Sequence, residues 1–288
     1  MKVFTEEQVE RFERDGYLFL EEALPPDVLK VLNDEFDAWV EESRSHGEPY
    51  GITIDGRPRF DLEPGHCAER PALRRIASPT ELSDAYLGVM RSGLAVDVTA
   101  QLIGPNIEFN HSKINSKQPG TATEVKFHQD ILFEAHTNDD MLAVLYFLDE
   151  VTLQNGPPKL VPGSHHGPLY EHWQDGVFTG AVAPAVAERA QAEAIPCIGP
   201  AGSACLMHGR VLHGSDPNLS DRPRTLFISA YRSEDSYPLE TSHVPSEHEG
   251  ELVRGVRTNR VRCTPIEMAF SEVPTGASFF EQQAGDRM

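Results

Sequence analysis

Apolar residues recur along this chain with two different periods, and the change of period separates its first third from the rest. In the first third the spacing is helical, with apolar positions three or four residues apart. The clearest stripe consists of Val28, Leu32, Phe36, Trp39 and Val40. We therefore expect one face of a helix in this region to pack against a core.

Capping residues mark where helices of this region begin and end. Thr5 and Gln8 have the spacing of a capping box, and Gly16 is placed to end that short helix. Pro25-Pro26-Asp27 opens the longer helix that carries the apolar stripe. Ser78-Pro79-Thr80-Glu81 predicts a third helix start, because proline is favoured in the first helical turn.

From residue 107 onward the pattern is typical of strands. Short β-branched or apolar runs alternate with turns rich in Gly and Pro. The expected strands are 107–114, 125–132, 141–148, 203–207 and 226–231. So many short strands in one half of a chain favour a jelly roll of two facing sheets. We predict a mainly β fold with helical flanks.

The 288 residues are predicted to form a single domain, 1–288. Its parts are a helix-rich N-terminal part (1–105), a jelly-roll core (106–232) with an insertion (166–196), and a C-terminal segment (233–288). Residues 44–66 are rich in Gly, Pro, His and charge. They are expected to form a loop, and this loop is a candidate cover for a site.

One spaced set of side chains has the pattern of a metal site. His128 and Asp130 form an H-x-D pair, and His213 follows far downstream. Side chains two residues apart in a strand point the same way, so the pair can reach one ion from a strand or strand end. The third ligand then comes from a neighbouring strand. Two imidazoles and one carboxylate leave metal positions open for substrate and dioxygen, which indicates a non-haem Fe(II) oxygenase rather than a closed zinc site.

This pattern leaves alternatives open. In a chain with 12 His and 45 acidic residues, an H-x-D pair can be a solvated histidine beside a surface aspartate. His208 competes for the third position, but it lies five residues before His213 and would face the other side of a regular strand. We expect hydrogen-bonded or surface histidines at His111, His136, His165 and His166.

Composition narrows the class of partner. Lys and Arg number 25 against 45 Asp and Glu, and the net charge of −20 disfavours nucleic acid and anionic membranes. No apolar run approaches a membrane span, and no apolar signal core opens the chain. The four cysteines form no C-x-x-C pair. We therefore expect a cytoplasmic protein with a small-molecule substrate, and a homo-oligomer stays open.

Further motifs surround the metal-binding pattern. They are Phe109-Asn110-His111-Ser112-Lys113-Ile114-Asn115, Phe127-His128-Gln129-Asp130, Phe147-Leu148-Asp149-Glu150, Asn155-Gly156-Pro157 with Val161-Pro162-Gly163-Ser164-His165, and His213-Gly214-Ser215-Asp216-Pro217-Asn218 with Arg224. In this order they resemble the phytanoyl-CoA dioxygenase family. This is a branch of the Fe(II)/2-oxoglutarate oxygenases that includes ectoine hydroxylase and bacterial amino-acid hydroxylases. The resemblance runs from Asp15-Gly16-Tyr17 to about Tyr231.

The resemblance implies a fold and a metal. The fold is a double-stranded β-helix, the cupin-like jelly roll, with the metal inside one open end. The implied ligands of Fe(II) are His128, Asp130 and His213. Relatives that chlorinate their substrates replace this carboxylate with a small residue, so Asp130 speaks against halogenation.

The resemblance also implies where 2-oxoglutarate binds. Arg224 is the implied salt-bridge partner of its remote carboxylate, a role that suits the planar, permanently charged guanidinium. Asn115 and Lys113 are implied to face the cosubstrate or the substrate. Ser215 and Asn218 are expected to form turns rather than to bind ligands.

The implied reaction consumes dioxygen and 2-oxoglutarate, releases succinate and carbon dioxide, and oxidises an unactivated C–H bond. We expect hydroxylation of a small polar metabolite, because the acidic chain shows no basic groove for the phosphates of a fatty acyl-CoA. Desaturation, epimerisation or cyclisation of a secondary-metabolite intermediate stays open. Two other classes also stay open, a non-catalytic metal-binding jelly roll and a cupin dioxygenase that uses no 2-oxoglutarate.

One position suggests the charge of the substrate. Similar hydroxylases place an aromatic residue six positions after the first metal-binding histidine, where this chain has Glu134 beside Phe133. A carboxylate in an enclosed site must be paired, hydrated or protonated. Glu134, Phe133 and His111 are therefore candidate substrate residues, and Glu134 predicts a substrate with an amine or other cationic group. The alternative is that Glu134 has turned out to solvent on a loop.

Overall fold

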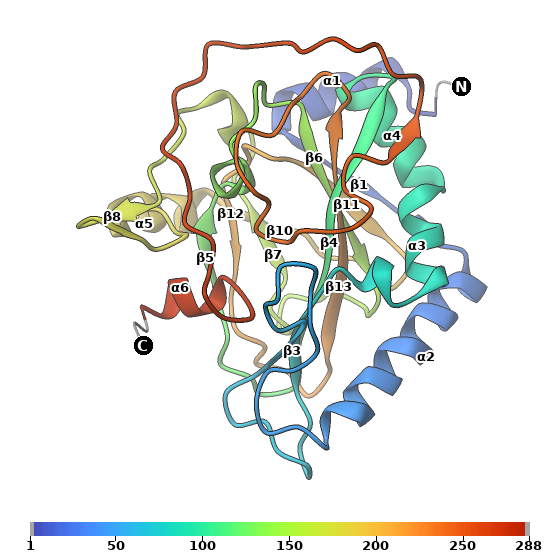
Figure 1. Ribbon diagram of the computed structural model, residues 1–288, viewed down its shortest axis with the longest axis vertical. Helices are drawn as coiled ribbons and strands as arrows, with labels where there is room; N and C mark the ends of the chain where they lie inside the picture. The colour runs from blue at the N-terminus through green and yellow to red at the C-terminus, as the bar shows by residue number, and fades with distance from the viewer. Residues whose placement is uncertain (1–2, 286–288) are drawn as a thin grey trace.

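The structure, a computed structural model, describes residues 3–285 and has a large antiparallel sheet at its centre (Figure 1). Its strands are β1 (Tyr17–Leu20), β2 (Phe60–Leu62), β3 (Leu73–Ala77), β4 (Ile107–Lys117), β6 (Met141–Phe147), β11 (Ala204–His208), β13 (Arg224–Ser233) and β14 (Leu252–Arg254). Seven of them follow the order β1-β11-β6-β13-β4-β3-β2, and β14 also pairs with β4.

A smaller antiparallel sheet faces the large one. Its strands, in spatial order, are β10 (Ile195–Pro196), β7 (Pro158–Leu160), β12 (His213–Ser215) and β5 (Val125–His128). Leu145 of β6, Met207 of β11 and Leu160 of β7 belong to one buried cluster that joins the two sheets. A separate hairpin consists of β8 (Trp173–Gln174) and β9 (Val177–Phe178). The predicted mainly β fold with helical flanks, two sheets packed face to face, is confirmed.

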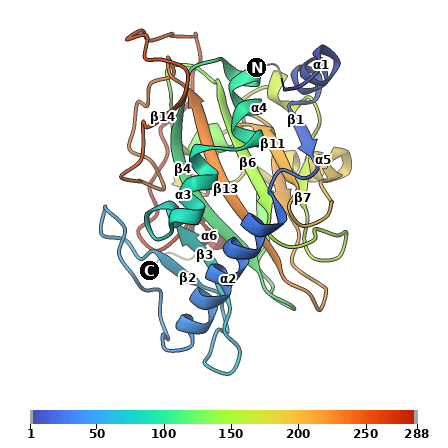
Figure 2. The same ribbon diagram turned by 90° about the vertical axis from the view of Figure 1, so that its right-hand side faces the viewer.

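Helices cover the face of the large sheet that turns away from the small one (Figure 2). The helices on this face are α1 (Glu6–Asp15), α2 (Pro26–Ser43), α3 (Asp84–Arg91) and α4 (Leu94–Ile103). By contrast, α5 (Pro184–Glu193) and α6 (Phe280–Ala284) contact β5 of the small sheet. The 3₁₀ turns are η1 (Pro79–Glu81), η2 (Asp130–Phe133) and η3 (Ser164–His166). Tyr86 of α3 meets Phe227 of β13 edge-on, with ring centroids 4.8 Å apart. Along β6, alternate side chains enter the helix-side cluster and the inter-sheet cluster, as the two-residue period of a strand requires.

The helix predictions were correct at two starts and wrong at the third. Thr5 and Gln8 form the predicted capping box, and α2 buries Leu32 and Phe36 of the predicted stripe. The chain from Ser78 makes only a 3₁₀ turn, and the regular helix α3 begins later. The reason lies in the caps: the Ser83 hydroxyl accepts hydrogen bonds from the first turn of α3, whereas Ser78 makes no cap bond.

Three strands of the N-terminal part were not predicted. They are β1, β2 and β3, which extend the large sheet at both edges. Because β2 lies within residues 44–66, the prediction of an uninterrupted loop there was wrong. The division of a single domain into three parts stays a prediction. Within residues 3–285 no helix combines the length and apolar character needed to cross a membrane.

Candidate metal centre and the two cavities beside it

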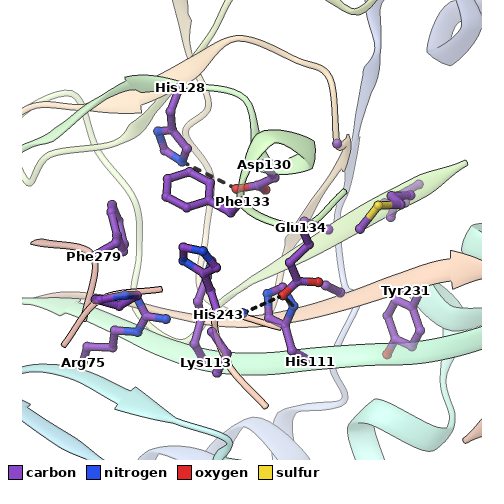
Figure 3. Close-up of a pocket in the computed structure, with 17 residues that line it drawn as sticks. Arg75, His111, Lys113, His128, Asp130, Phe133, Glu134, Tyr231, His243 and Phe279 are labelled. Atoms are coloured by element: carbon purple, nitrogen blue, oxygen red, sulfur yellow. Dashed lines mark hydrogen bonds and ion pairs between the residues drawn. The ribbon is translucent and has the colours of Figure 1, made fainter. Parts of the chain in front are cut away.

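Three predicted ligand residues meet at the open end of the small sheet. His128 ends β5, and Asp130 begins η2 directly after it. β12 pairs with β5 in a register that places His213 opposite His128. The Asp130 Oδ1 atom lies 3.5 Å from His128 Nε2 and 3.8 Å from His213 Nε2 (Figure 3 shows the first pair). In the described part of the chain, this is the one group of three His, Cys, Asp or Glu residues whose ligand atoms all lie within 4.8 Å of one another.

The hydrogen bonds of both imidazoles leave their Nε2 lone pairs facing Asp130. His128 Nδ1 donates to the Lys126 carbonyl at 2.8 Å, and His213 Nδ1 donates to the Val211 carbonyl at 2.9 Å. Burial and the neighbouring His128 lower the pKa of His213 to about 4, so its ring is neutral at neutral pH. Although burial alone would raise the pKa of Asp130, the contacts with His213 and His128 hold it well below its usual range. Two imidazole nitrogens and a carboxylate oxygen that face one another fit a metal cation.

The competing histidines have other partners. His208 Nδ1 accepts the backbone N–H of Arg210 at 3.1 Å, and its ring packs near Phe12 and His165, away from the metal-binding group. His165 and His166 both bond the Glu13 carbonyl, at 3.0 and 2.7 Å. His136 Nδ1 donates to the Glu134 carbonyl at 2.8 Å. The expected hydrogen-bonded histidines at positions 136, 165 and 166 are therefore found.

A cavity on one side of the metal-binding group contains Arg224, and we call it the Arg224 cavity. Arg224 begins β13, is only 2% exposed, and donates its Nε to the Gly156 carbonyl at 3.0 Å. No ion pair involves it among residues 3–285. Burial lowers its pKa to about 10, which leaves it charged at neutral pH. The other polar lining residues include Lys113, Asn115, Lys117, His128, Asp130, His213 and Ser215. A buried guanidinium without a carboxylate partner is suited to an anionic ligand.

Two residues of this cavity were not predicted as site residues. Lys117 Nζ donates to Ser215 Oγ at 2.7 Å, and burial together with nearby Arg224 lowers the pKa of Lys117 to about 6. The turn prediction for Ser215 was wrong, because it lies in β12. Asn218 does form a turn, with its Oδ1 accepting the Ser220 N–H at 2.9 Å. The two-residue period that joins His111 to Lys113 on β4 continues to Lys117, so this residue could have been found.

A second cavity lies on the other side of the metal-binding group and contains Arg75, and we call it the Arg75 cavity. Its polar and aromatic lining includes Arg75, His111, Lys113, His128, Asp130, Phe133, Glu134, His243 and Phe279 (Figure 3). His128 and Asp130 line both cavities, and so does Lys113. The metal-binding group therefore lies between two separate lobes. Arg75 belongs to β3, which was not predicted, and no local pattern identifies it.

Glu134 is buried in the Arg75 cavity, so the alternative that it points to solvent was wrong. It is 4% exposed, and its Oε2 accepts a hydrogen bond from Asn110 at 2.7 Å. Its Oε1 lies 3.3 Å from His111 Nδ1 and also accepts the Ser242 hydroxyl. Burial would raise the pKa of Glu134, but His111 and its other donors hold it well below its usual range. The amine contact stays a prediction, and an amine would have to replace one of these donors.

The C-terminal segment covers both cavities. Phe279 lines both, with its ring centroid 5.9 Å from that of His128 and 5.8 Å from that of Phe133. Val244 and Pro274 complete this side of the Arg75 cavity. In the described chain, no residue of 44–66 lines either cavity, so the prediction of that segment as the cover was wrong.

Gly214 sets the distance between the two strands that carry the histidines. A Cβ atom at this position would lie 2.7 Å from the Val125 carbonyl oxygen of β5. We expect Gly214→Ala to push β12 away from β5 and to weaken Fe(II) binding about 10–100-fold, as changes in the support of metal ligands do. Anaerobic Fe(II) titration measures this effect. Gly88→Ala is the control, because a Cβ there meets open space. Unchanged Fe(II) affinity in Gly214→Ala would show that strand spacing does not control the site.

Comparison with known proteins identifies the family. The model of the family described as Phytanoyl-CoA dioxygenase (PhyH) matches residues 12–226. A "probable alpha-ketoglutarate-dependent hypophosphite dioxygenase" of Stutzerimonas stutzeri is 32% identical, over 98% of this chain and 97% of that protein. L-proline trans-4-hydroxylase of Streptomyces griseoviridis is 27% identical, over 82% of this chain and 89% of that one. The solved structure of EctD from S. alaskensis with bound Fe aligns with a TM-score of 0.67 at 20% identity, over 86% of this chain and 88% of that one.

These findings agree with the geometry of the site. The family match spans most of the chain, and the Stutzerimonas protein aligns with it almost from end to end. The EctD structure shows the same fold. The chain therefore belongs to the phytanoyl-CoA dioxygenase family, whose members are iron- and 2-oxoglutarate-dependent dioxygenases, and it is an enzyme of that class.

Proposed function

We propose that the protein uses Fe(II), 2-oxoglutarate and dioxygen to hydroxylate a small polar substrate. The observation that carries this proposal is the position of the metal-binding group between two buried cavities, each with a guanidinium that forms no ion pair within residues 3–285. An oxygenase of this class must hold both its cosubstrate and its substrate beside one metal ion. Here each ligand has a cavity of its own.

His128, Asp130 and His213 are the proposed ligands of Fe(II). The bonds from His128 to the Lys126 carbonyl and from His213 to the Val211 carbonyl hold both rings with Nε2 toward the metal. Bound iron supplies what amino acids lack, the activation of dioxygen coupled to decarboxylation of 2-oxoglutarate. The protein supplies orientation and a dry enclosure.

The Arg224 cavity is the proposed site of 2-oxoglutarate. Arg224 would pair with the remote carboxylate, because its fork is charged and buried and forms no ion pair within the described chain. Asn115 and Lys113 are proposed to contact the cosubstrate from β4, and the buried Asn115 Oδ1 has no hydrogen-bond partner in the described structure. Phe279 separates this cavity from solvent on the side of the C-terminal segment.

The Arg75 cavity is the proposed site of the substrate. Phe133, Glu134 and His111 line it, and the Phe133 ring packs edge-on against His128 with centroids 5.5 Å apart. In the overall reaction, one oxygen atom of dioxygen enters the substrate and the other enters succinate. Hydroxylation adds an oxygen atom to the substrate, whereas desaturation removes two hydrogens, so the product mass separates these outcomes.

Hypophosphite is the first substrate to test, because the Stutzerimonas relative that is named for this substrate matches nearly the whole chain. Its P–H bond would become P–OH, which converts hypophosphite to phosphite with the same consumption of 2-oxoglutarate and dioxygen. L-proline and ectoine, named for two other relatives, are the C–H alternatives.

The test measures succinate in protein supplied with Fe(II), 2-oxoglutarate and air. We expect one of the three compounds to raise succinate formation severalfold above the rate without substrate, with the oxidised product formed in equal amount. Phosphite is detected by phosphorus NMR, and the hydroxylated organic products are detected by mass. Failure to form succinate under any condition, in protein that holds iron, would contradict the proposal.

A further inference from the structure

Arg75 is a buried cation without an ion-pair partner among the described residues. Its side chain comes from β3 and is 4% exposed, and its Nε and Nη1 atoms have no hydrogen-bond partner in the described structure. No carboxylate within residues 3–285 forms an ion pair with it. Burial lowers the pKa of Arg75 to about 10, so it still carries its charge at neutral pH. An unpaired buried charge destabilises a fold, and proteins keep such a charge where a ligand completes the site.

The acidic residues that could neutralise Arg75 are occupied. Asp61, directly opposite on β2, accepts hydrogen bonds from Arg74 at 2.9 and 3.0 Å. Glu134 is held by Asn110, His111 and Ser242. Asp130 belongs to the metal-binding group. Arg75 instead lies with its Cζ atom 5.3 Å from the centre of the Phe279 ring, at the wall of the cavity (Figure 3).

Lys113 adds a second cation to the same wall. It projects from β4, the strand beside β3, on the side of the cavity opposite His128 and Asp130 (Figure 3). In the described chain it forms no ion pair. Burial lowers the pKa of Lys113, and this residue also lines the Arg224 cavity. Glu134 stays ionised, but its oxygens are occupied by Asn110, His111 and Ser242. The unfilled hydrogen-bond donors of Arg75 therefore favour an anionic substrate, opposite in charge to the one that Glu134 alone predicted from the sequence.

Size does not distinguish the two cavities. Their volumes are similar, about 50 Å³ for the Arg75 cavity and about 60 Å³ for the Arg224 cavity. Their ligands are therefore assigned by charge and by the residues that line each cavity. The remote carboxylate of 2-oxoglutarate does not account for Arg75, because Arg224 lies in the other cavity.

We propose that Arg75 binds the negative group of a small oxyanion substrate. A phosphorus oxyanion and a short carboxylate share this chemistry, in which a guanidinium fork donates two hydrogen bonds to two oxygens. This inference rests on the proposed function, because it assigns the Arg75 cavity to the substrate. It makes Arg75 a specificity-determining residue of the oxygenase.

The test is a calorimetric titration without oxygen, so that ligands bind and do not react. Protein with Fe(II) and 2-oxoglutarate is titrated with hypophosphite, with acetate and with methylammonium, a cation of similar size. We expect wild type to bind at least one of the two anions and to bind methylammonium more weakly. Preference for one anion identifies the phosphorus or the carboxylate source. Binding of neither anion, or tighter binding of methylammonium, would overturn the proposal.

Two variants of β3 assign the effect to one residue. Arg75→Met should weaken binding of the preferred anion about thirtyfold or more, with less than about a threefold change in the affinity for 2-oxoglutarate. Arg74→Met removes the neighbouring charge, which pairs with Asp61 outside the cavity, and should leave anion affinity unchanged. Equal losses of anion and 2-oxoglutarate affinity in Arg75→Met would place Arg75 in the cosubstrate site and overturn the proposal.

Thermal unfolding of the ligand-free protein separates binding from a structural role. Because Arg75→Met removes an unpaired buried cation, its Tm should equal or exceed that of wild type. A lower Tm with unchanged anion affinity would show a structural role and overturn the proposal.

The visible band of the Fe(II)·2-oxoglutarate complex, recorded on the same samples, tests the proposed function separately. Arg75-dependent anion binding without that band would leave the anion site standing and the oxygenase assignment wrong.

Discussion

His213→Ala is expected to abolish 2-oxoglutarate turnover and to weaken Fe(II) binding by more than about 100-fold. The substitution removes one of three ligand atoms and leaves His128 and Asp130 to hold the metal alone. His128→Ala and Asp130→Ala are expected to have the same effect, since the three side chains form one group. Anaerobic Fe(II) titration and succinate formation measure the two losses.

His208→Ala is the matched control for this prediction. His208 is also a largely enclosed histidine, but it bonds the Arg210 backbone and packs near Phe12 and His165. We expect its loss to leave Fe(II) affinity unchanged. Full activity in His213→Ala together with inactivity in His208→Ala would show that the third ligand has been misassigned.

Arg224→Ala is expected to raise the 2-oxoglutarate concentration needed for half-maximal turnover about thirtyfold to several thousandfold. Loss of a buried, charge-assisted contact typically costs about 2–5 kcal/mol, which corresponds to this range. Fe(II) affinity should change little, because Arg224 bonds the Gly156 carbonyl and, among the described residues, none of the three metal-binding side chains. The measurement is the dependence of succinate formation on 2-oxoglutarate, with Fe(II) titrated separately.

Arg222→Ala removes the same charge two residues away. The Arg222 side chain is 74% exposed, and Glu150, at 3.4 Å, is its one ion-pair partner within residues 3–285. A surface pair of this kind contributes little, so kinetics close to wild type are expected. If Arg222→Ala were the damaging change and Arg224→Ala the harmless one, the assignment of the cosubstrate cavity would be wrong.

The metal-binding group could be predicted because its geometry is local. His128 and Asp130 lie two residues apart, and a strand end brings both to one side. The same period places His111, Lys113 and Asn115 on one face of β4, where the structure has them lining the cavities. The roles of these residues stay proposals until iron and 2-oxoglutarate are bound and measured.

Residues brought in by distant pairing could not be predicted. Arg75 reaches the site because β3 pairs with β4 in a register that sets it opposite Asn115. The strand around it reads Leu-Arg-Arg-Ile-Ala, in which two adjacent arginines show no sign of which one is buried. Phe279 comes from the other end of the chain, and its place over both cavities depends on the path of the C-terminal segment. Neither contact leaves a signal in the nearby sequence.

Glu134 lies near the metal-binding group, as predicted, but its partners in the folded chain favour a different substrate charge from the one the sequence suggested. The sequence places a carboxylate near the metal, and the structure buries it there. Its oxygens accept hydrogen bonds from Asn110 and Ser242 and lie beside His111, and these residues come from β4 and the C-terminal segment. The group left to bind a substrate is therefore Arg75, whose lack of an ion-pair partner among the described residues only the folded chain reveals.

The visible spectrum of the anaerobic protein tests the central claim most directly. When 2-oxoglutarate is added to the Fe(II) protein without oxygen, we predict a weak charge-transfer band, because the cosubstrate would bind the metal held by His128, Asp130 and His213. The band should appear at the wild-type 2-oxoglutarate concentration in Arg222→Ala, require far more 2-oxoglutarate in Arg224→Ala, and be absent from His213→Ala. A wild-type protein that binds both Fe(II) and 2-oxoglutarate yet shows no such band would contradict the account.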